Sequence, residues 1–351
     1  MASNHRIFSL NYFGGLLALV LCLNGCATRS PVTDGMVLSL RKGESFIATN
    51  DPAYATTLQV RWLGTACYLL QLGDKIIFTD PFLTHHSLAR VGLGGSIESN
   101  PEIVRKTVEG LPVPRAIFVG HSHYDHMLDL AECLKQPAWA DVPVYGSVTT
   151  CNLLSGYGPQ FTNGWNPVVT NAAWREVADG IRYQAVAARH GKQLPLLPLL
   201  FPGKIEAPLC KPPHRAGHFK VGDTYAFVFE LSNDRAGYTI YFVGATHRNQ
   251  EGFPQESVKS VDVAILCSPT WRLAKGYPDN IIQRLKARHV IASHYDNFFQ
   301  VNQKETEVTP RADLPGFLLR AQKSANYPEF ESILVPAVGS VLRFEGKTGG
   351  R

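Results

Sequence analysis

The first strongly patterned part of the chain consists of three short segments, one alternating and two apolar. Residues 58–62 alternate apolar and polar positions, as expected of a strand with one buried face. Residues 67–72 and 75–79 are mostly apolar, and the Gly73-Asp74 pair between them predicts a hairpin turn. We therefore expect the folded domain to begin with a strand followed by a β-hairpin.

Apolar runs of strand length recur through the rest of the chain. We expect further strands at 115–120, 142–146, 181–188, 225–231, 238–244, 261–267, 289–292 and 333–335. Apolar residues at near-helical spacing predict a helix over 127–134, and Pro278-Asp279 predicts the start of another. The Gly- and Pro-containing segments 82–114 and 151–175 are expected to be long loops.

Size and composition allow one large folded domain or two smaller ones. The chain has 351 residues, and 45% of them are hydrophobic, which is enough for a sizeable core. The formal net charge of +5 is spread along the chain, so no nucleic-acid partner is predicted and an anionic substrate is only weakly favoured. The cysteines include no C-x-x-C pair, so neither a zinc ribbon nor a thioredoxin-like site is indicated.

Residues 1–25 have the pattern of a bacterial signal peptide. They carry one formal charge, at Arg6, and an apolar run at 16–23 that is too short to span a bilayer. The run leads into Leu-Asn-Gly-Cys at 23–26, which resembles a lipobox. We therefore expect cleavage before Cys26 and lipidation of its thiol, with an ordinary secretory signal as the alternative.

The same pattern predicts where the protein resides. Ala27 follows the lipidated cysteine, and by resemblance to bacterial sorting rules this favours the outer membrane, with the protein facing the periplasm. Residues 26–55 show no clear periodicity and are interpreted as a tether. A lipid-anchored protein of the cell envelope, with the membrane as a partner, is the resulting prediction; the oligomeric state stays open.

Three imidazoles and one carboxylate lie within six residues, directly after the apolar run at 115–120. His121 and His123 are two positions apart, so on an extended chain their side chains point to the same side and can coordinate one metal ion. Asp125 and His126 follow after the chain has turned and can reach a second ion. Imidazole and carboxylate suit zinc, with manganese or iron as alternatives. A solvated His-rich loop is the competing interpretation.

This stretch resembles the HxHxDH signature of the metallo-β-lactamase-fold hydrolases at all four ligand positions. The runs WLGTACYLLQLGDKIIFTDP and VIASHYDNF are similar to the branch that contains L-ascorbate-6-phosphate lactonase and the phospholipase D acting on N-acyl-phosphatidylethanolamine. The resemblance covers about residues 56–345. It implies a single α/β (α+β) domain with the αββα four-layer sandwich, two β-sheets packed together with helices outside.

The resemblance also assigns roles to residues outside the cluster. His190 matches the third ligand of the first metal, and His294 matches the last ligand of the second. Asp80 matches an aspartate that supports the ligands from behind. Asp125 would ligate or orient the nucleophile, and His294 would ligate or donate a proton. Taken without the resemblance, His190 also fits a hydrogen-bonded strand-end histidine, and Asp80 a turn aspartate.

One position departs from the family pattern. The family has Gly-Asp-Thr after the second of two paired strands, and its aspartate bridges both metals, whereas this chain has Ala245 there. Three interpretations stay open: His247 substitutes in part, the site holds a single ion, or catalysis is lost. A three-histidine site with an open position is by itself competent for zinc chemistry.

The resemblance implies a metal-dependent hydrolase in which metal-activated water attacks a phosphodiester, an ester or a lactone. The segment 191–222 is predicted to be an insertion, and its apolar, proline-rich part at 194–202 is either an acyl-binding or membrane-touching lip or a cover for the core. Together with lipid anchoring, such a lip points to a phosphodiester or an acyl lipid as the substrate, and a lactone or a nucleotide stays open. The competing hypothesis is a catalytically impaired lipoprotein that binds metal, ligand or a partner.

Overall fold

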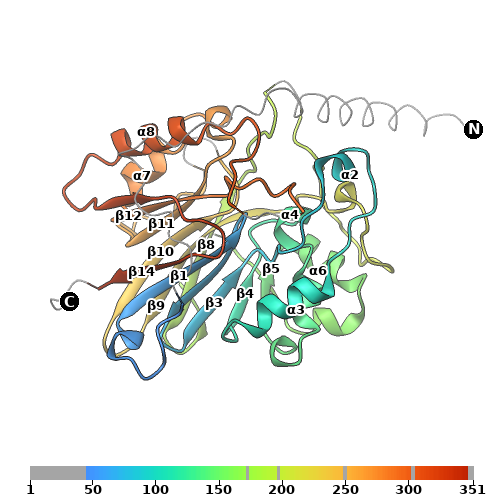
Figure 1. Ribbon diagram of the computed structural model, residues 1–351, viewed down its shortest axis with the longest axis horizontal. Helices are drawn as coiled ribbons and strands as arrows, with labels where there is room; N and C mark the ends of the chain where they lie inside the picture. The colour runs from blue at the N-terminus through green and yellow to red at the C-terminus, as the bar shows by residue number, and fades with distance from the viewer. Residues whose placement is uncertain (1–44, 171–173, 196–197, 248–250, 302–304, 347–351) are drawn as a thin grey trace, which may run out of the picture.

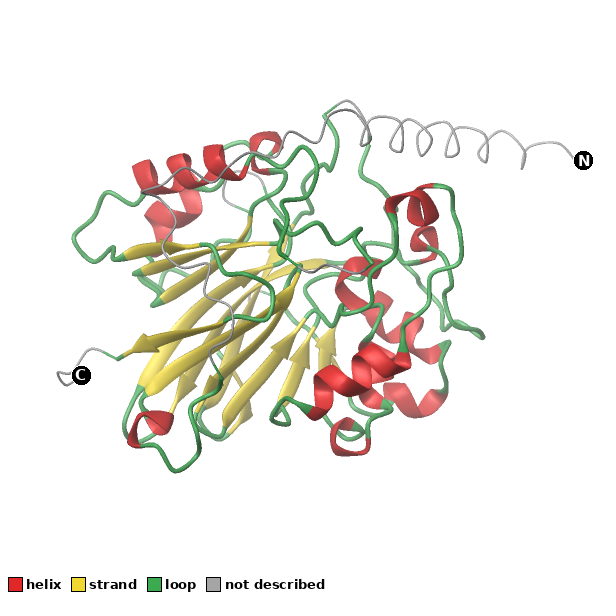
Figure 2. Ribbon diagram, in the orientation of Figure 1, coloured by secondary structure: helices red, strands yellow, loops and turns green. Residues whose placement is uncertain are grey.

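The computed structural model describes residues 45–170, 174–195, 198–247, 251–301 and 305–346. Within these residues the strands form two seven-stranded sheets packed face to face, and helices lie on the outer faces (Figures 1 and 2). The predicted αββα sandwich in a single domain is thereby confirmed.

The first sheet has the strand order β14-β1-β2-β3-β4-β5-β6. Its strands are β1 (Thr57–Gly64), β2 (Cys67–Leu72), β3 (Lys75–Thr79), β4 (Ala116–Phe118), β5 (Val144–Gly146), β6 (Trp165–Pro167) and β14 (Val341–Glu345). Strands β14, β1, β2 and β3 are antiparallel neighbours, and β2 and β3 form the hairpin that the sequence predicts. Strands β3, β4, β5 and β6 are parallel, so their carboxyl ends share one edge.

The second sheet has the order β13-β12-β11-β10-β9-β8-β7. Its strands are β7 (Arg175–Ala178), β8 (Ile181–Ala188), β9 (Thr224–Ser232), β10 (Gly237–Val243), β11 (Val263–Cys267), β12 (His289–Ser293) and β13 (Ser332–Leu334). The pairs β7–β8, β8–β9 and β9–β10 are antiparallel, whereas β10, β11, β12 and β13 are parallel. Strands β8, β10 and β12 therefore point the same way.

Two apolar cores hold the layers together. Between the sheets, Tyr68 of the first sheet meets Phe242 of the second edge to face, with ring centroids 6.2 Å apart. Between the first sheet and its helices, Phe78 meets Trp139 in the same way at 5.1 Å. All four side chains are fully buried or nearly so, as the central layer of a sandwich requires.

The helices of five residues or more that the described chain contains are short. They are α2 (Leu88–Gly92), α3 (Pro101–Glu109), α5 (Leu130–Leu134), α6 (Val148–Ser155), α7 (Asp279–Leu285) and α8 (Leu314–Ser324). Helices α3, α5 and α6 cover the first sheet, and α7 and α8 cover the second (Figure 1). None of the helices in the described part of the chain is long and apolar enough to cross a membrane.

The long loop predicted for 82–114 is wrong, because α2 and α3 interrupt it. The one predicted for 151–175 is also wrong in part, because α6 extends into it and β6 lies within it. Helix α3 begins with a full capping signal: the Asn100 side chain accepts from the backbone N–H groups of Glu102 and Ile103, and Pro101 occupies the first turn. The only buried side chains of α3 are Val104 and Val108, so its apolar stripe is too narrow to stand out in the sequence.

The predicted signal peptide at 1–25 and Cys26 lie outside the described residues. The described part of the predicted tether, 45–55, packs on the domain. The Ile47 N–H donates to the Gln59 side-chain oxygen at 2.6 Å, and the Gly73 N–H donates to the Tyr54 carbonyl at 3.0 Å. Residues 45–55 therefore contact β1 and the β2–β3 turn.

Candidate metal centre and its pocket

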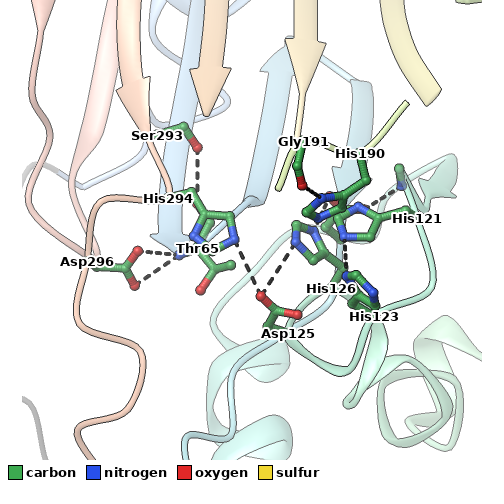
Figure 3. A network of polar contacts seen from close by, with 12 residues as sticks. Thr65, His121, His123, Asp125, His126, His190, Gly191, Ser293, His294 and Asp296 are labelled. Atoms are coloured by element: carbon green, nitrogen blue, oxygen red, sulfur yellow. Dashed lines mark hydrogen bonds and ion pairs between the residues drawn. The ribbon is translucent and has the colours of Figure 1, made fainter. Parts of the chain in front are cut away.

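The site lies where strands of both sheets end at one edge of the sandwich. Strand β3 delivers Asp80, β4 leads into the 121–126 stretch, and β8 and β12 end just before His190 and His294. Because these strands run in the same direction, segments far apart in the sequence meet at their carboxyl ends, which is a common location for functional sites. Figure 3 shows the side chains gathered there.

The first ligand group consists of His121, His123 and His190. One ligand atom from each residue lies within 4.8 Å of the others, and the ring centroids are 4.6 to 4.9 Å apart. Ser122 points the other way, because its hydroxyl bonds those of Ser147 and Thr150 at 3.2 and 2.9 Å. The two-residue alternation that the sequence predicts therefore places both histidines on the side of His190.

The second ligand group consists of Asp125, His126 and His294, again with one ligand atom from each within 4.8 Å of the others. Asp125 Oδ2 lies 3.8 Å from His126 Nε2 and 3.5 Å from His294 Nε2 (Figure 3). Asp125 and His126 come from the one-turn helix α4 (Tyr124–Met127). The rings of His121 and His126 are 3.8 Å apart, so the two groups adjoin.

Asp80 supports the second group from behind. Its Oδ2 accepts from His126 Nδ1 at 2.8 Å, and its Oδ1 accepts from the Gly120 N–H at 2.6 Å. With the proton on Nδ1, His126 presents the lone pair of Nε2 on the side of Asp125, where it can bind a metal. A Cβ at Gly244 would lie 2.6 Å from Asp80 Oδ2, so only glycine permits this close approach.

The electrostatics keep the histidines of the first group neutral. Burial lowers the pKa of all three: that of His123 to about 4, that of His190 to about 3 and that of His121 well below its usual value. Burial alone would raise the pKa of Asp125, but His126 and His294 lower it below the ordinary range. The first group thus offers neutral imidazoles and the second an ionised carboxylate, the protonation states that bind metals.

These residues fit a divalent cation. Nε2 of His121 lies 3.1 Å from Nδ1 of His123, and Nδ1 of His190 donates to the Gly191 carbonyl at 2.6 Å, which leaves Nε2 of His190 free. Neutral imidazoles whose ring nitrogens lie this close can turn their lone pairs to one cation. Imidazole nitrogen with one carboxylate is a donor set that zinc, manganese and iron accept.

Three residues at the site have strained backbone that neighbouring hydrogen bonds hold in place. Thr65, Asp80 and His294 have φ values of 49°, 40° and 62°, in a region that side chains disfavour. The Thr65 N–H donates to both Asp296 carboxylate oxygens at 2.9 and 3.0 Å, and the His294 N–H donates to the Thr65 carbonyl at 3.0 Å. The β1–β2 turn therefore fixes the backbone that presents His294. Such strain persists where surrounding contacts over-determine it and concentrates at functional sites.

Ala245 and His247 follow β10. Ala245 is buried and lines the pocket beside the ligands, so its methyl group faces the site. His247 belongs to neither ligand group of the described residues. Its Nε2 lies 3.1 Å from the Tyr241 hydroxyl, and that hydroxyl donates to the Gly252 carbonyl at 3.1 Å. The structure therefore does not bring His247 to the position of a substitute ligand.

Both ligand groups open into one pocket of about 200 Å³, to whose lining each contributes. Its walls are largely apolar: Leu194, Leu200 and Phe201 come from the predicted insertion, and Phe298 and Phe299 from the loop after β12. The part of the insertion that the structure describes therefore forms a wall of the site. In volume the pocket is smaller than the roughly 300–1,000 Å³ typical of sites for drug-sized ligands.

Sequence reasoning missed several lining residues. Phe298 and Phe299 follow the ligand His294 within five positions, and this proximity is a signal that could have identified them. Arg311 also lines the pocket, but it lies on a later loop and its only local signal is the turn-forming Pro310 before it.

Comparison with known proteins agrees with this architecture. The model of the family described as "Beta-lactamase superfamily domain" matches residues 77–295, well over half of the chain. The chain therefore belongs to the metallo-β-lactamase fold superfamily.

Its curated relatives match only in part. Proteins of Sulfurisphaera tokodaii and Thermoplasma acidophilum, both named UPF0173 metal-dependent hydrolases, are 29% and 30% identical over 136 and 133 residues. Each match covers 38% of this chain, and 52% and 48% of the respective relative. A Saccharolobus solfataricus protein of the same name is 35% identical over 77 residues, 22% of this chain and 28% of that protein. The chain thus spans about half, or less, of these relatives.

Solved structures show the same fold. A metallo hydrolase from the archaeon Ignicoccus hospitalis superposes with a TM-score of 0.50 at 14% identity, covering 83% of this chain and all of that one. An isothiocyanate hydrolase from Delia radicum gut bacteria gives 0.50 at 17% identity, covering 82% of this chain and all of that one. At these identities the likeness concerns the fold alone.

Proposed function

We propose that this protein is a metal-dependent hydrolase of small esters, lactones or phosphodiesters that carry an apolar substituent. The observation that carries the proposal is the pair of adjoining ligand groups opening into one apolar pocket. The names of the curated relatives, all metal-dependent hydrolases, support the same reaction class. Zinc is the proposed metal, in one or two ions, because imidazole dominates the donor set.

A divalent cation bound here would lower the pKa of water and polarise a substrate oxygen. The chain's own residues supply the rest. His121, His123 and His190 would hold the first ion, and Asp125, His126 and His294 the second. Asp125, ionised within reach of His294, would orient the attacking water, and His294 would ligate or pass a proton to the leaving group.

The pocket supports a substrate with an apolar portion of limited size. The leucine and phenylalanine side chains of its walls would stabilise a bound apolar group, because binding removes apolar surface from water. A volume of about 200 Å³ suits one short apolar substituent rather than a whole diacyl lipid. If a phospholipid is the substrate, only its reacting portion would therefore enter the pocket.

Turnover with counted metal tests the proposal. Purified protein would be assayed on bis-4-nitrophenyl phosphate, 4-nitrophenyl butyrate and γ-nonalactone, with metal per chain measured by mass spectrometry. We expect hydrolysis of at least one probe that chelation abolishes and zinc restores. Bound metal without turnover of any probe would contradict hydrolysis, and absence of metal binding would contradict the site itself.

A second function is favoured by one observation, the methyl group of Ala245 where the superfamily pattern has a carboxylate. A protein that binds metal or ligand without turnover would explain it. The variant Ala245→Asp separates the two functions. Binding alone is the native function if the variant gains both a second equivalent of metal and hydrolytic activity that the native protein lacks. Activity of the native protein contradicts it.

We also propose that Cys26 carries lipid and anchors the protein in the bacterial outer membrane, facing the periplasm. Support comes from the apolar run at 16–23 and the lipobox-like residues that follow it. The protein should partition with membranes and incorporate labelled palmitate, and Cys26→Ser should remove the label. Equal labelling of the variant would contradict the anchor.

A further inference from the structure

We infer that Arg311 binds an anionic group, a carboxylate or a phosphate, at one wall of the pocket, so that the preferred substrate is a small amphiphile with an apolar body and a negative charge away from the reacting bond. This inference rests on the proposed function, because it uses the same pocket. Arg311 is exposed, and it is the one Lys or Arg side chain among the described residues that line the pocket.

Arg311 occupies a backbone position that favours glycine. Residues 309–312 form a turn closed by the Ala312 N–H, which donates to the Thr309 carbonyl at 3.1 Å. Pro310 is the second residue of the turn, and Arg311 is the third, with φ of 68°. Proline followed by a positive φ is the pattern of a type II turn, whose third residue is commonly glycine because a Cβ there is crowded. A positive φ at a residue other than glycine is one mark of a functional position, and at Arg311 it coincides with a place in the pocket lining.

The guanidinium group has no ion pair or hydrogen bond with any described residue. The nearest acid along the chain, Asp313, is already engaged, since it pairs with Arg272 at 2.6 Å and accepts from the Gly316 N–H at 3.1 Å. Arg311 is therefore available to a ligand. A guanidinium with its five donors matches the two oxygens of a carboxylate or phosphate in a bidentate geometry.

The turn is fixed relative to the metal ligands. The Thr309 N–H donates to the Tyr295 carbonyl at 2.7 Å, and Asp296 pairs with Val308 as a β-bridge. Tyr295 and Asp296 directly follow the ligand His294. Two contacts thus connect the backbone that carries Arg311 to the backbone that presents His294, so the charge and the ligand groups keep a defined separation across one pocket.

The surroundings strengthen the preference for an anion. Phe298, Phe299 and Pro310 line the same pocket, so a ligand whose charge meets Arg311 could bury its apolar part against these side chains. The carboxylate that lines the pocket, Asp125, lies within ion-pair distance of His126 and His294, in the ligand group rather than beside Arg311. A substrate that spans the pocket would meet the ligand groups with its reacting bond and Arg311 with its charge.

The test compares charged and neutral ligands with similar apolar chains in the protein with its metal bound. Hexanoate, hexyl phosphate and neutral hexanamide would be titrated calorimetrically into the native protein and into Arg311→Gly and Arg311→Lys. We expect Arg311→Gly to weaken hexanoate or hexyl phosphate at least tenfold more than hexanamide, and Arg311→Lys to retain part of the preference. The anion that loses more affinity identifies the charged group.

The matched control is Lys286→Gly, because Lys286 also has a left-handed backbone, with φ of 43°, but does not line the pocket. Both glycine variants should keep or raise the melting temperature, and Lys286→Gly should leave anion affinity unchanged. Equal losses for charged and neutral ligands in Arg311→Gly, or no loss at all, would overturn the inference. Because these readouts are binding constants, they stay informative if no hydrolysis is found.

Discussion

The two ligand groups of the candidate metal centre are built on different principles. The first consists of three imidazoles, the buried His121 and His123 and the partly buried His190, brought together by the ends of two strands from different sheets. The second contains a carboxylate, Asp125, and a histidine, His126, that is hydrogen-bonded to another carboxylate, Asp80. Metal binding by the first group therefore depends mainly on where the backbone places the imidazoles. Metal binding by the second group depends mainly on the negative charge of the carboxylates.

This difference explains how the site tolerates Ala245. Three neutral imidazoles with an open position suffice for one divalent cation, so the first group needs no bridging carboxylate. The second group holds one direct carboxylate, and its remaining negative charge lies behind His126. Loss of a bridging carboxylate thus weakens the second group and spares the first.

The largest effect is expected from His121→Ala combined with His123→Ala. Removal of two of the three ligands of the first group should release one metal ion per chain and lower hydrolysis by roughly a thousandfold or more. Metal analysis and initial rates measure both. The control is His214→Ala with His218→Ala, a second histidine pair with rings 4.6 Å apart that belongs to neither group. An unchanged metal content in the first variant would refute the site.

A smaller effect is expected from Asp80→Asn, which should weaken the second group selectively. Removing the charge behind His126 should reduce metal affinity there about 10- to 100-fold, as for other groups that orient a ligand. Competition with a fluorescent chelator measures the affinity of each ion. The first group, which makes no hydrogen bond to Asp80, should keep its ion.

Asp129→Asn is the matched control for Asp80→Asn. Asp129 is also a fully buried carboxylate that accepts backbone N–H groups, from Leu83 and Thr84, but it contacts no ligand. Its variant should lose stability while retaining metal affinity. If both variants lower metal affinity equally, Asp80 acts through the fold rather than through His126.

Sequence reasoning could predict the fold and ligand set because local patterns carry them. The alternation around His121 and His123, and the position of His190 after an apolar run, follow from strand periodicity and from the resemblance. The structure brings together all six residues predicted as ligands. Asp80 lies against His126.

Long-range contacts explain what the sequence did not predict. Helix α3 has only two buried side chains, so periodicity was weak, although the cap at Asn100 could have marked its start. The position of His247 depends on Tyr241 and Gly252, which no spacing rule connects with it. Arg311 joins the site only through the contact of its turn with the loop after β12.

The neutral state of the first group predicts a pH dependence in the metal-free protein. Unfolded histidines take up a proton near pH 6.5, whereas burial holds the pKa of His123 at about 4 and that of His190 at about 3. Between pH 6.5 and 4 the unfolded state therefore binds more protons, so stability falls as the pH falls, by about 1.4 kcal/mol per pH unit for each such histidine. Urea unfolding at pH 7.5, 5.5 and 4.5 measures this slope.

The control for this dependence replaces both titrating rings. His123→Asn with His190→Asn should flatten the slope in the metal-free protein, while the His214→Ala, His218→Ala pair should leave it unchanged. Saturating zinc should add stability at pH 7.5 and lose that addition in acid, since protons compete for the same nitrogens. A slope that persists without His123 and His190 would assign the acid sensitivity to other groups.

The smallest effect is expected from His247→Phe, which tests whether this histidine belongs to either group. The structure has its Nε2 facing the Tyr241 hydroxyl, so the variant should lose that hydrogen bond and about 1 kcal/mol of stability, with metal content unchanged. Tyr241→Phe removes the same bond from the other side and should cost a similar amount. Loss of a metal ion in His247→Phe but not in Tyr241→Phe would instead make His247 a ligand, and the second group would then hold its ion with a substitute for the carboxylate missing at Ala245.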